Sequence, residues 1–135
     1  MANRAWRSVL LTVAIAACRS AGPDVVVIRA PRPTLVAFAP KDADEDQLVD
    51  FRGEHAAIRD WCERAGIAFE SVSARELRIC NRTITPPGVA YVIAQRGRVP
   101  RSLPGAHSPD RVIAETCEYF RRDAKVRAAC IAMDR

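Results

Sequence analysis

Hydrophobic positions in the middle of the chain recur at helical spacing. From Asp44 to Ala65 the positions that form one stripe stand three or four residues apart: Leu48, Phe51, His55, Ile58, Cys62 and Ala65. Residues at this spacing share one face of an α-helix, so the segment predicts a helix packed on a core. Asp44 can cap its N-terminus and Gly66 can end it. Gly53 weakens its middle by about 1 kcal/mol.

Short runs rich in apolar and β-branched residues lie on both sides of this helix, at 34–39 and 67–72. Each run predicts a strand. If the two strands are parallel, the helix between them forms a right-handed crossover. A third apolar run at 89–94, the turn at 95–98 and the segment 99–103 together predict a β-hairpin.

Three further segments predict shorter elements. The apolar patch Val25–Ile28 can be recruited as an edge strand, and 74–79 fits one short helical turn. Ser108 followed by Pro109 is typical of a helix start, since the hydroxyl caps and proline suits the first helical position. The buried face of that helix is made of Ile113, Cys117, Phe120 and Ala124. Residues 121–135 either prolong it or form a second short helix.

The first residues have the pattern of an export signal. Arg4 and Arg7 precede an apolar run at 9–17 that is too short to span a bilayer. The run ends in Ile15-Ala16-Ala17-Cys18, which resembles the lipobox of bacterial lipoprotein precursors. Cleavage by the ordinary signal peptidase at Ala14-Ile15-Ala16 and an uncleaved anchor are the alternatives.

The lipobox resemblance implies that 1–17 is a signal peptide and that 18–32 is a lipidated N-terminus and tether. Cys18 would carry diacylglycerol and an acyl chain, which hold the protein on the membrane of the bacterial cell envelope. Because Arg19 rather than aspartate follows Cys18, the resemblance implies the outer membrane, facing the periplasm, in a host with two membranes.

Composition narrows the class of partner. Removing 17 of the 135 residues leaves 118, enough for one domain. Because Arg4 and Arg7 leave with the signal, the formal net charge falls from +5 to +3. The basic residues are mixed with acidic ones and lack the concentrated stripe and stacking aromatics of a nucleic-acid-binding surface. We therefore expect no nucleic-acid partner.

Four cysteines remain once Cys18 is assigned to lipid. They are Cys62, Cys80, Cys117 and Cys130. An even number in an exported domain predicts structural disulfides, with three possible full pairings. Cys117 and Cys130 would lie about 20 Å apart in a continuous helix, beyond the ~7 Å limit between bridged Cα atoms. They can pair only if the chain turns back near Arg122-Asp123.

The sequence gives little support for a metal or cofactor site. The cysteines stand 18, 37 and 13 residues apart, and neither His55 nor His107 belongs to a ligand cluster. Asp42, Asp44 and Asp46 occupy the first, third and fifth positions of a calcium loop, but the sixth and twelfth positions lack the required glycine and glutamate. Helix capping explains these acids better, and we expect no metal or cofactor.

Two aromatic side chains on the long helix have structural interpretations. His55 lies on the stripe, which predicts a partly buried, hydrogen-bonded histidine rather than a catalytic base. Trp61 is one position off the stripe, which predicts the edge of the core; an exposed partner contact is the alternative.

The order strand, long helix, parallel strand, proline turn, hairpin and helix is similar to the core of the thioredoxin fold. Two local segments carry the resemblance: Thr34 into the capped helix, and Pro87-Gly88-Val89-Ala90-Tyr91-Val92 followed by Arg96-Gly97-Arg98. They look like that family's central strand with its active-site helix, and its cis-proline strand with its charged-glycine hairpin. The closest likeness is to small bacterial thioredoxin-like domains without a dithiol.

The resemblance implies an α/β fold for 33–121, with a central mixed sheet of about four strands in a β-α-β-β-α core flanked by helices. Residues 122–135 would be a C-terminal helical extension. Pro87 would be the cis-proline, with Pro86 as the alternative register. In this arrangement the helices that carry Cys62 and Cys117 cover the same sheet face, so these two cysteines are a second possible pair.

The sequence departs from the thioredoxin pattern where that family places its C-x-x-C dithiol. Lys41-Asp42-Ala43-Asp44-Glu45 stands there instead. Carboxylates cannot exchange disulfides, and their negative charge would raise the pKa of a nearby thiol. We therefore expect a non-catalytic, membrane-anchored envelope lipoprotein that binds a protein partner in an accessory, assembly or inhibitor role. An envelope redox or oxidative-stress protein that uses the scattered cysteines is the alternative.

Overall fold

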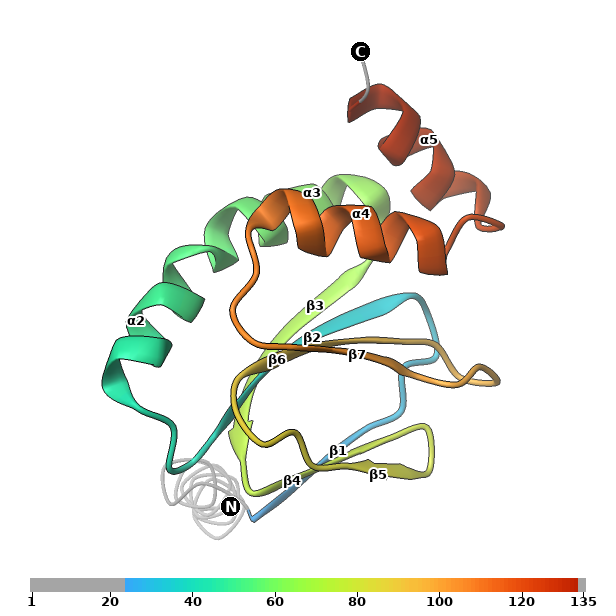
Figure 1. Cartoon of the computed structure of the whole chain (residues 1–135). Helices are drawn as coiled ribbons and strands as arrows, with labels where there is room; N and C mark the ends of the chain where they lie inside the picture. Colours follow the sequence, from blue (N-terminus) through green and yellow to red (C-terminus); the bar gives the residue numbers. More distant parts are fainter. Residues whose placement is uncertain (1–23, 134–135) are drawn as a thin grey trace, which may run out of the picture.

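The computed structural model describes residues 24–133, which form a mixed α/β structure in three layers. Helices cover one face of a four-stranded sheet, and a three-stranded sheet covers the other face (Figure 1). The strands are β1 (Val25–Ile28), β2 (Thr34–Pro40), β3 (Ala68–Ala74), β4 (Glu76–Ile79), β5 (Arg82–Ile84), β6 (Ala90–Ala94) and β7 (Arg101–Pro104). The helices are α2 (Glu45–Gly53), α3 (His55–Ala65), α4 (Pro109–Tyr119) and α5 (Ala124–Met133).

The larger sheet has the strand order β3-β2-β6-β7. β2 is parallel to β3 and antiparallel to β6, and β6 is antiparallel to β7. The predicted strands, their parallel pairing and the predicted hairpin are therefore confirmed. β2 and β6 lie at the centre and are buried on both faces, which explains why their sequences are continuously apolar.

Alternate residues of the central strands supply two separate cores. On β2, Leu35 and Ala37 pack under the helices, whereas Val36 and Phe38 face the smaller sheet. Strand β6 repeats the pattern, with Tyr91 and Ile93 on the helix side and Val92 and Ala94 on the other. This is the two-residue period of a strand that is covered on both faces. We call these the helix-side core and the small-sheet core.

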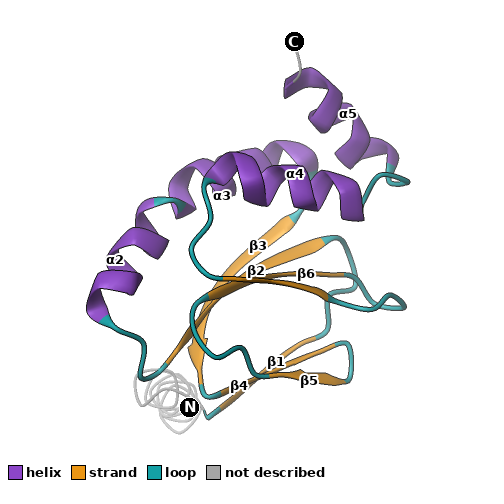
Figure 2. Cartoon of the chain, in the orientation of Figure 1, coloured by secondary structure: helices purple, strands orange, loops and turns teal. Residues whose placement is uncertain are grey.

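The smaller sheet has the order β1-β4-β5 and lies below the larger one in Figure 2. Its first strand confirms the edge strand predicted at Val25–Ile28. The helical turn predicted at 74–79 is wrong, because β4 pairs in parallel with β1 and antiparallel with β5. Leu77 and Ile79 are both fully buried in the small-sheet core. The energy gained from burying Leu77 and Ile79 and from pairing β4 with its neighbours exceeds the weak local helix preference of this segment.

The helix predicted from Asp44 to Ala65 is two helices, α2 and α3, that meet at Glu54. Gly53 ends the first helix, as expected of a residue that weakens a helix interior. The break still leaves Phe51 and His55 buried on the core side. Asp44 caps α2, since its Oδ1 accepts a hydrogen bond from the Asp46 backbone N–H at 3.3 Å.

The C-terminal region confirms the second short helix. α3 and α4 lie side by side over the sheet, and α5 turns back and projects outward from them (Figure 1). Ser108 Oγ accepts from the Arg111 N–H at 3.3 Å and starts α4, and Asp123 Oδ1 accepts from the Val126 N–H at 2.9 Å and starts α5. Between residues 24 and 133, no helix combines the length and apolar character needed to cross a membrane.

Candidate functional site

The predicted lipidation site cannot be placed in the fold. Cys18, the signal peptide 1–17 and residues 18–23 of the tether lie outside the described residues. The first described residue, Asp24, already belongs to the fold, because its backbone carbonyl accepts hydrogen bonds from the N–H groups of Arg75 and Glu76 at 3.2 and 2.9 Å.

The segment 41–45, where the sequence resemblance places a dithiol in thioredoxins, lies at the junction of β2 and α2, and a hollow of about 540 Å³ is found beside it. We call it the junction groove. It is lined by Pro40, Lys41, Asp42, Arg75, Thr85, Pro86 and Pro87. The lining contains no thiol, so it offers no group for thiol–disulfide exchange.

Charged side chains from three segments meet beside the junction groove. Asp24 Oδ1 lies 3.5 Å from Lys41 Nζ and 3.6 Å from Arg75 Nε. Because the Asp24 and Arg75 side chains are about three-quarters exposed, each ion pair contributes only about 0–1 kcal/mol. The pairs tie the start of β1 to the β2–α2 and β3–β4 connections without creating a reactive group.

The expected cis-proline is not present. All peptide bonds of residues 24–133 are trans, including the bonds that precede Pro86 and Pro87. The trans isomer is the ordinary preference of such a bond, by about 0.5–1 kcal/mol. Pro87 is exposed in the loop before β6, so little packing acts against that preference.

Two of the four cysteines form a disulfide. Cys117 and Cys130 are bonded, with their Cα atoms 6.1 Å apart. The chain turns between α4 and α5, where the Asp123 N–H donates to the Phe120 carbonyl at 2.9 Å. This is the reversal that the pairing required, and the alternative pair of Cys62 with Cys117 is not formed.

The expectation that all four cysteines are oxidised is wrong in this structure, because Cys62 and Cys80 are free. Cys62 is fully buried in the helix-side core, whereas Cys80 packs against the small-sheet core. The central sheet separates the two thiols. Burial raises the pKa of Cys62 to about 12; it also raises the pKa of Cys80, although Arg96 opposes the shift. Neither thiol has the depressed pKa of a reactive cysteine.

Three polar side chains buried on the helix side each have one atom without a hydrogen-bond partner among residues 24–133. These atoms are His55 Nε2, Trp61 Nε1 and Tyr91 Oη. The hydrogen bond predicted for the buried His55 is therefore not found at Nε2; the ring packs edge-on against Phe51 and Phe69, with centroids 4.7 and 5.6 Å apart. Trp61 is completely buried in the core rather than at its edge or on the surface.

Burial also controls the ionisation of this cluster. It lowers the pKa of His55, and the positive charges of Arg59 and Arg52 lower it further. Burial raises the pKa of Tyr91 to about 12, with a smaller contribution from Glu54. Both groups are therefore neutral near pH 7. Within residues 24–133, no three metal-ligating side chains gather into a metal site.

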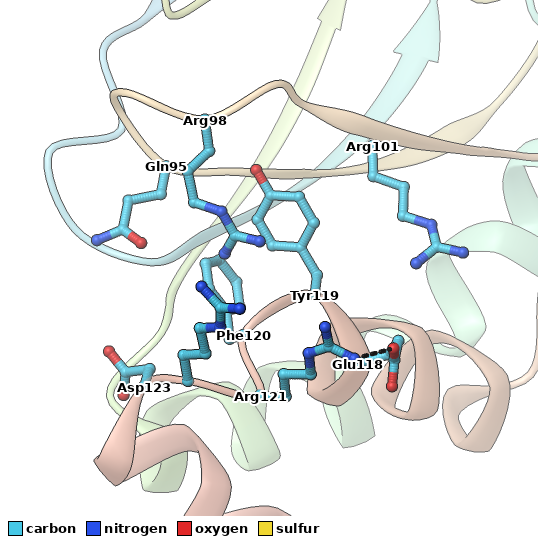
Figure 3. Close-up of a pocket in the computed structure, with 9 residues that line it drawn as sticks. Gln95, Arg98, Arg101, Glu118, Tyr119, Phe120, Arg121 and Asp123 are labelled. Atoms are coloured by element: carbon cyan, nitrogen blue, oxygen red, sulfur yellow. Dashed lines mark hydrogen bonds and ion pairs between the residues drawn. The ribbon is translucent and has the colours of Figure 1, made fainter.

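A cationic pocket of about 580 Å³, not predicted from the sequence, lies between the β6–β7 turn and the end of α4 (Figure 3). We call it the arginine pocket. It is lined by Gln95, Arg98, Arg101, Glu118, Tyr119, Phe120, Arg121, Arg122 and Asp123. The turn and the helix end are separated by about twenty residues of sequence, so no local motif signals that they meet. The nearest signal is the run of basic residues from Arg121 onward.

The sequence matches no protein-family model and no curated protein. Its function is therefore inferred from its own residues and their geometry.

Proposed function

We propose that this chain is a non-catalytic lipoprotein of the bacterial cell envelope, held on the membrane through Cys18. Within its folded part, 33–121 would be a thioredoxin-like domain that binds a protein partner in an accessory, assembly or inhibitor role. In a host with two membranes it would face the periplasm from the outer membrane. The chemistry of the junction groove is the observation that carries the non-catalytic part of this proposal.

The junction groove supports binding over catalysis because it has the wrong side chains for redox chemistry. A thioredoxin needs two thiols at the start of the helix, one of them with a lowered pKa. In this chain the corresponding segment carries Lys41 and Asp42, and Asp44 is used as the cap of α2. Beside the position where a thioredoxin has its nucleophilic thiol, this chain has Lys41 and Arg75 in ion pairs with Asp24.

The order of elements supports the thioredoxin-like assignment. Strand β2, the helical crossover α2–α3, the parallel strand β3, the hairpin β6–β7 and helix α4 follow one another as in that core. The chain departs from it by adding β1, by inserting the β4–β5 hairpin before β6, and by a trans bond at Pro87.

The free cysteines favour the binding role over the redox alternative. Cys62 is inaccessible and Cys80 is a single thiol whose pKa is raised rather than lowered. The two thiols cannot form a disulfide with each other in this fold, because the sheet separates them. The Cys117–Cys130 bond stabilises the connection between α4 and α5, which suits a rigid binding scaffold.

Metabolic labelling with an alkyne fatty acid in a bacterial host tests the anchor. The wild-type chain and a Cys80→Ala variant should both be labelled and retained in the membrane fraction, whereas Cys18→Ala should lose both properties. These two variants each remove one cysteine and so control for the loss of a thiol. Unlabelled wild-type protein would refute the lipoprotein assignment.

Photo-crosslinking in the intact envelope tests the binding role. A photoreactive residue at exposed positions such as Val49 and Val99 should give discrete crosslinked products of defined mass. Catalysed reduction of insulin by dithiothreitol above the buffer rate would contradict the non-catalytic role, especially if Cys80→Ala abolished it.

A further inference from the structure

The arginine pocket contains more positive charge than the fold itself neutralises. Its lining has four arginines and two carboxylates, a surplus of two positive charges. Arg101 Nη2 lies 2.9 Å from Glu115 Oε2, and Arg121 Nη1 lies 3.3 Å from Glu118 Oε1. The second of these pairs is drawn in Figure 3. Two of the four arginines are therefore already paired with acids of α4.

The other two, Arg98 and Arg122, have no carboxylate partner among residues 24–133. The remaining acid of the lining is also engaged, because Asp123 Oδ1 accepts the Val126 N–H that begins α5. The pocket thus presents two arginines whose N–H donors form no ion pair with an acidic residue of the described chain. An arginine presents five N–H donors, suited to bidentate pairing with a carboxylate or a phosphate.

Arg98 is held in place before any ligand arrives. Its Cζ lies 3.9 Å from the centroid of the Tyr119 ring and 5.7 Å from that of Phe120. Tyr119 is itself fixed, since its hydroxyl donates to the Val99 carbonyl at 2.9 Å, and burial raises its pKa so that the hydroxyl keeps its proton. Figure 3 shows Arg98 reaching from the β6–β7 turn to this ring. Stacking on a ring face fixes the guanidinium plane while its edge stays open for hydrogen bonds.

The surroundings favour a singly charged carboxylate over a doubly charged phosphate. Glu118 and Asp123 line the pocket. The last carbonyls of α4 carry the negative end of the helix dipole, about half a charge, at the same place. These negative groups repel a doubly charged phosphate more strongly than a singly charged carboxylate. One carboxylate can also pair with one arginine guanidinium through two hydrogen bonds.

We infer that the arginine pocket binds an acidic peptide segment, through carboxylates that pair with Arg98 and Arg122. This inference rests on the proposed protein-binding function and names the chemistry of the partner at one site. Because the rings of Tyr119 and Phe120 already hold the Arg98 side chain, less conformational entropy is lost when a ligand binds to it.

The chain offers a matched control. A second, smaller hollow of about 370 Å³ contains Arg32, Arg59 and Lys125 with one acid, Glu63. Arg59 also lies over a ring there, with its Cζ 5.4 Å from the centroid of Phe69. The double variant R32Q/R59Q therefore removes the same charge and the same kind of stacked arginine as R98Q/R122Q, but from a different surface.

Fluorescence anisotropy of labelled peptides on the full chain, purified in detergent, tests the inference at about 0.15 M salt. The probe is a heptapeptide with alternating glutamates, and its glutamine counterpart is the neutral control. We expect R98Q/R122Q to weaken binding of the acidic peptide at least about tenfold, as for loss of charge-assisted hydrogen bonds, and R32Q/R59Q to change it less than about twofold. Arg98→Lys should recover only part of the affinity because it keeps the charge and loses the fork.

Equal loss in both double variants would overturn the inference, since it would show general attraction between charges. Equal binding of the glutamine peptide, or tighter binding of inorganic phosphate than of the acidic peptide in competition, would also overturn it. Arg122→Gln alone guards against misfolding, because this exposed side chain makes no ion pair with another described residue; it should still weaken binding.

Crosslinking in the intact envelope separates failure of the inference from failure of the proposed function. If the wild-type chain and R98Q/R122Q yield the same crosslinked partner in equal amounts, the protein binds a partner and the pocket is not its site. If neither yields a partner, the binding function is rejected, while the peptide titration still decides whether the pocket takes carboxylates.

Discussion

The two faces of the four-stranded sheet are covered by layers whose buried side chains differ in chemistry. On the small-sheet side the core is aliphatic apart from Phe38, and the covering layer is closed by hydrogen bonds between β1, β4 and β5. On the helix side the buried rings of His55, Trp61 and Tyr91 each carry a polar atom that has no hydrogen-bond partner among residues 24–133. That side is also closed by the Cys117–Cys130 bond.

Stability should therefore depend on pH and reductant mainly through the helix side, although burial also raises the pKa of Cys80 beside the small-sheet core. An apolar core responds to loss of volume, whatever the pH or redox state. A core with buried ionisable groups and a covalent bond responds to protons and reductant as well. The stability of the helix side should therefore respond most to pH and to reductant. Helix α4, which ends at the arginine pocket, belongs to this side.

The largest effect should come from a cavity on the small-sheet face. Phe38 is completely buried there, and Phe38→Ala should lower the free energy of unfolding by about 3–5 kcal/mol. Phe51→Ala on the helix side should cost a similar amount, since Phe51 is buried to the same degree. Urea unfolding at pH 7 measures both. A loss below about 1 kcal/mol for Phe38→Ala would mean that the smaller sheet does not pack on the larger one as described.

The disulfide should provide the next largest effect, and only on the helix side. Its loop closes over 13 residues of separation, which corresponds to about 3 kcal/mol in the chain-entropy account. The double variant C117A/C130A should lose about that amount. Cys80→Ala is the matched control on the other face and should lose clearly less. Wild-type stability that does not change on adding dithiothreitol, once reduction is verified by mass, would contradict this prediction.

Acid should weaken the helix side through His55. The folded state holds the pKa of His55 below the value of 6.5 that it has in the unfolded chain. Neutral His55 therefore contributes fully above pH 6.5, and stability should fall as the pH drops below 6.5 toward the lowered pKa. His55→Phe should remove this part of the pH dependence in thermal unfolding between pH 5 and 7.5. An unchanged acid slope in His55→Phe would assign the dependence to other groups.

The smallest effect should come from Tyr91. Its hydroxyl is buried without a hydrogen-bond partner in the described part of the chain, so Tyr91→Phe should leave stability unchanged or raise it by up to about 1 kcal/mol at pH 7. Since the folded pKa is about 12 and the unfolded value is 10, the wild type should lose stability as the pH rises above 10, and the variant should lose less. A destabilisation of about 2 kcal/mol at pH 7 would show that the hydroxyl has a partner after all.

Much of the fold could be predicted from local pattern. The alternation and apolar runs located β2, β3 and β6, and the helical stripes located α3 and α4 with their caps. The pairing of Cys117 with Cys130 was identified as one of two options, together with the chain reversal that it requires. These features succeed because a strand or helix that buries one face must repeat its apolar residues at a fixed period.

The candidate site was predicted less well. Lys41 and Asp42 do lie at the junction groove, but the cis isomer expected at Pro87 and the oxidation expected for Cys62 and Cys80 are not found. The arginine pocket was not anticipated at all. Each of these depends on which segments meet in space, about which a linear pattern carries little information.

The sequence by itself determined the identity and order of the main elements and the absence of a dithiol after β2, because local periodicity and residue chemistry are written position by position. Only the tertiary structure decided that 76–79 is a strand, that the long helix breaks at Glu54, and that the sheet separates Cys62 from Cys80. It also brought Arg98 onto Tyr119. These outcomes depend on contacts between residues far apart in the chain, whose burial and pairing energies exceed the differences in local preference.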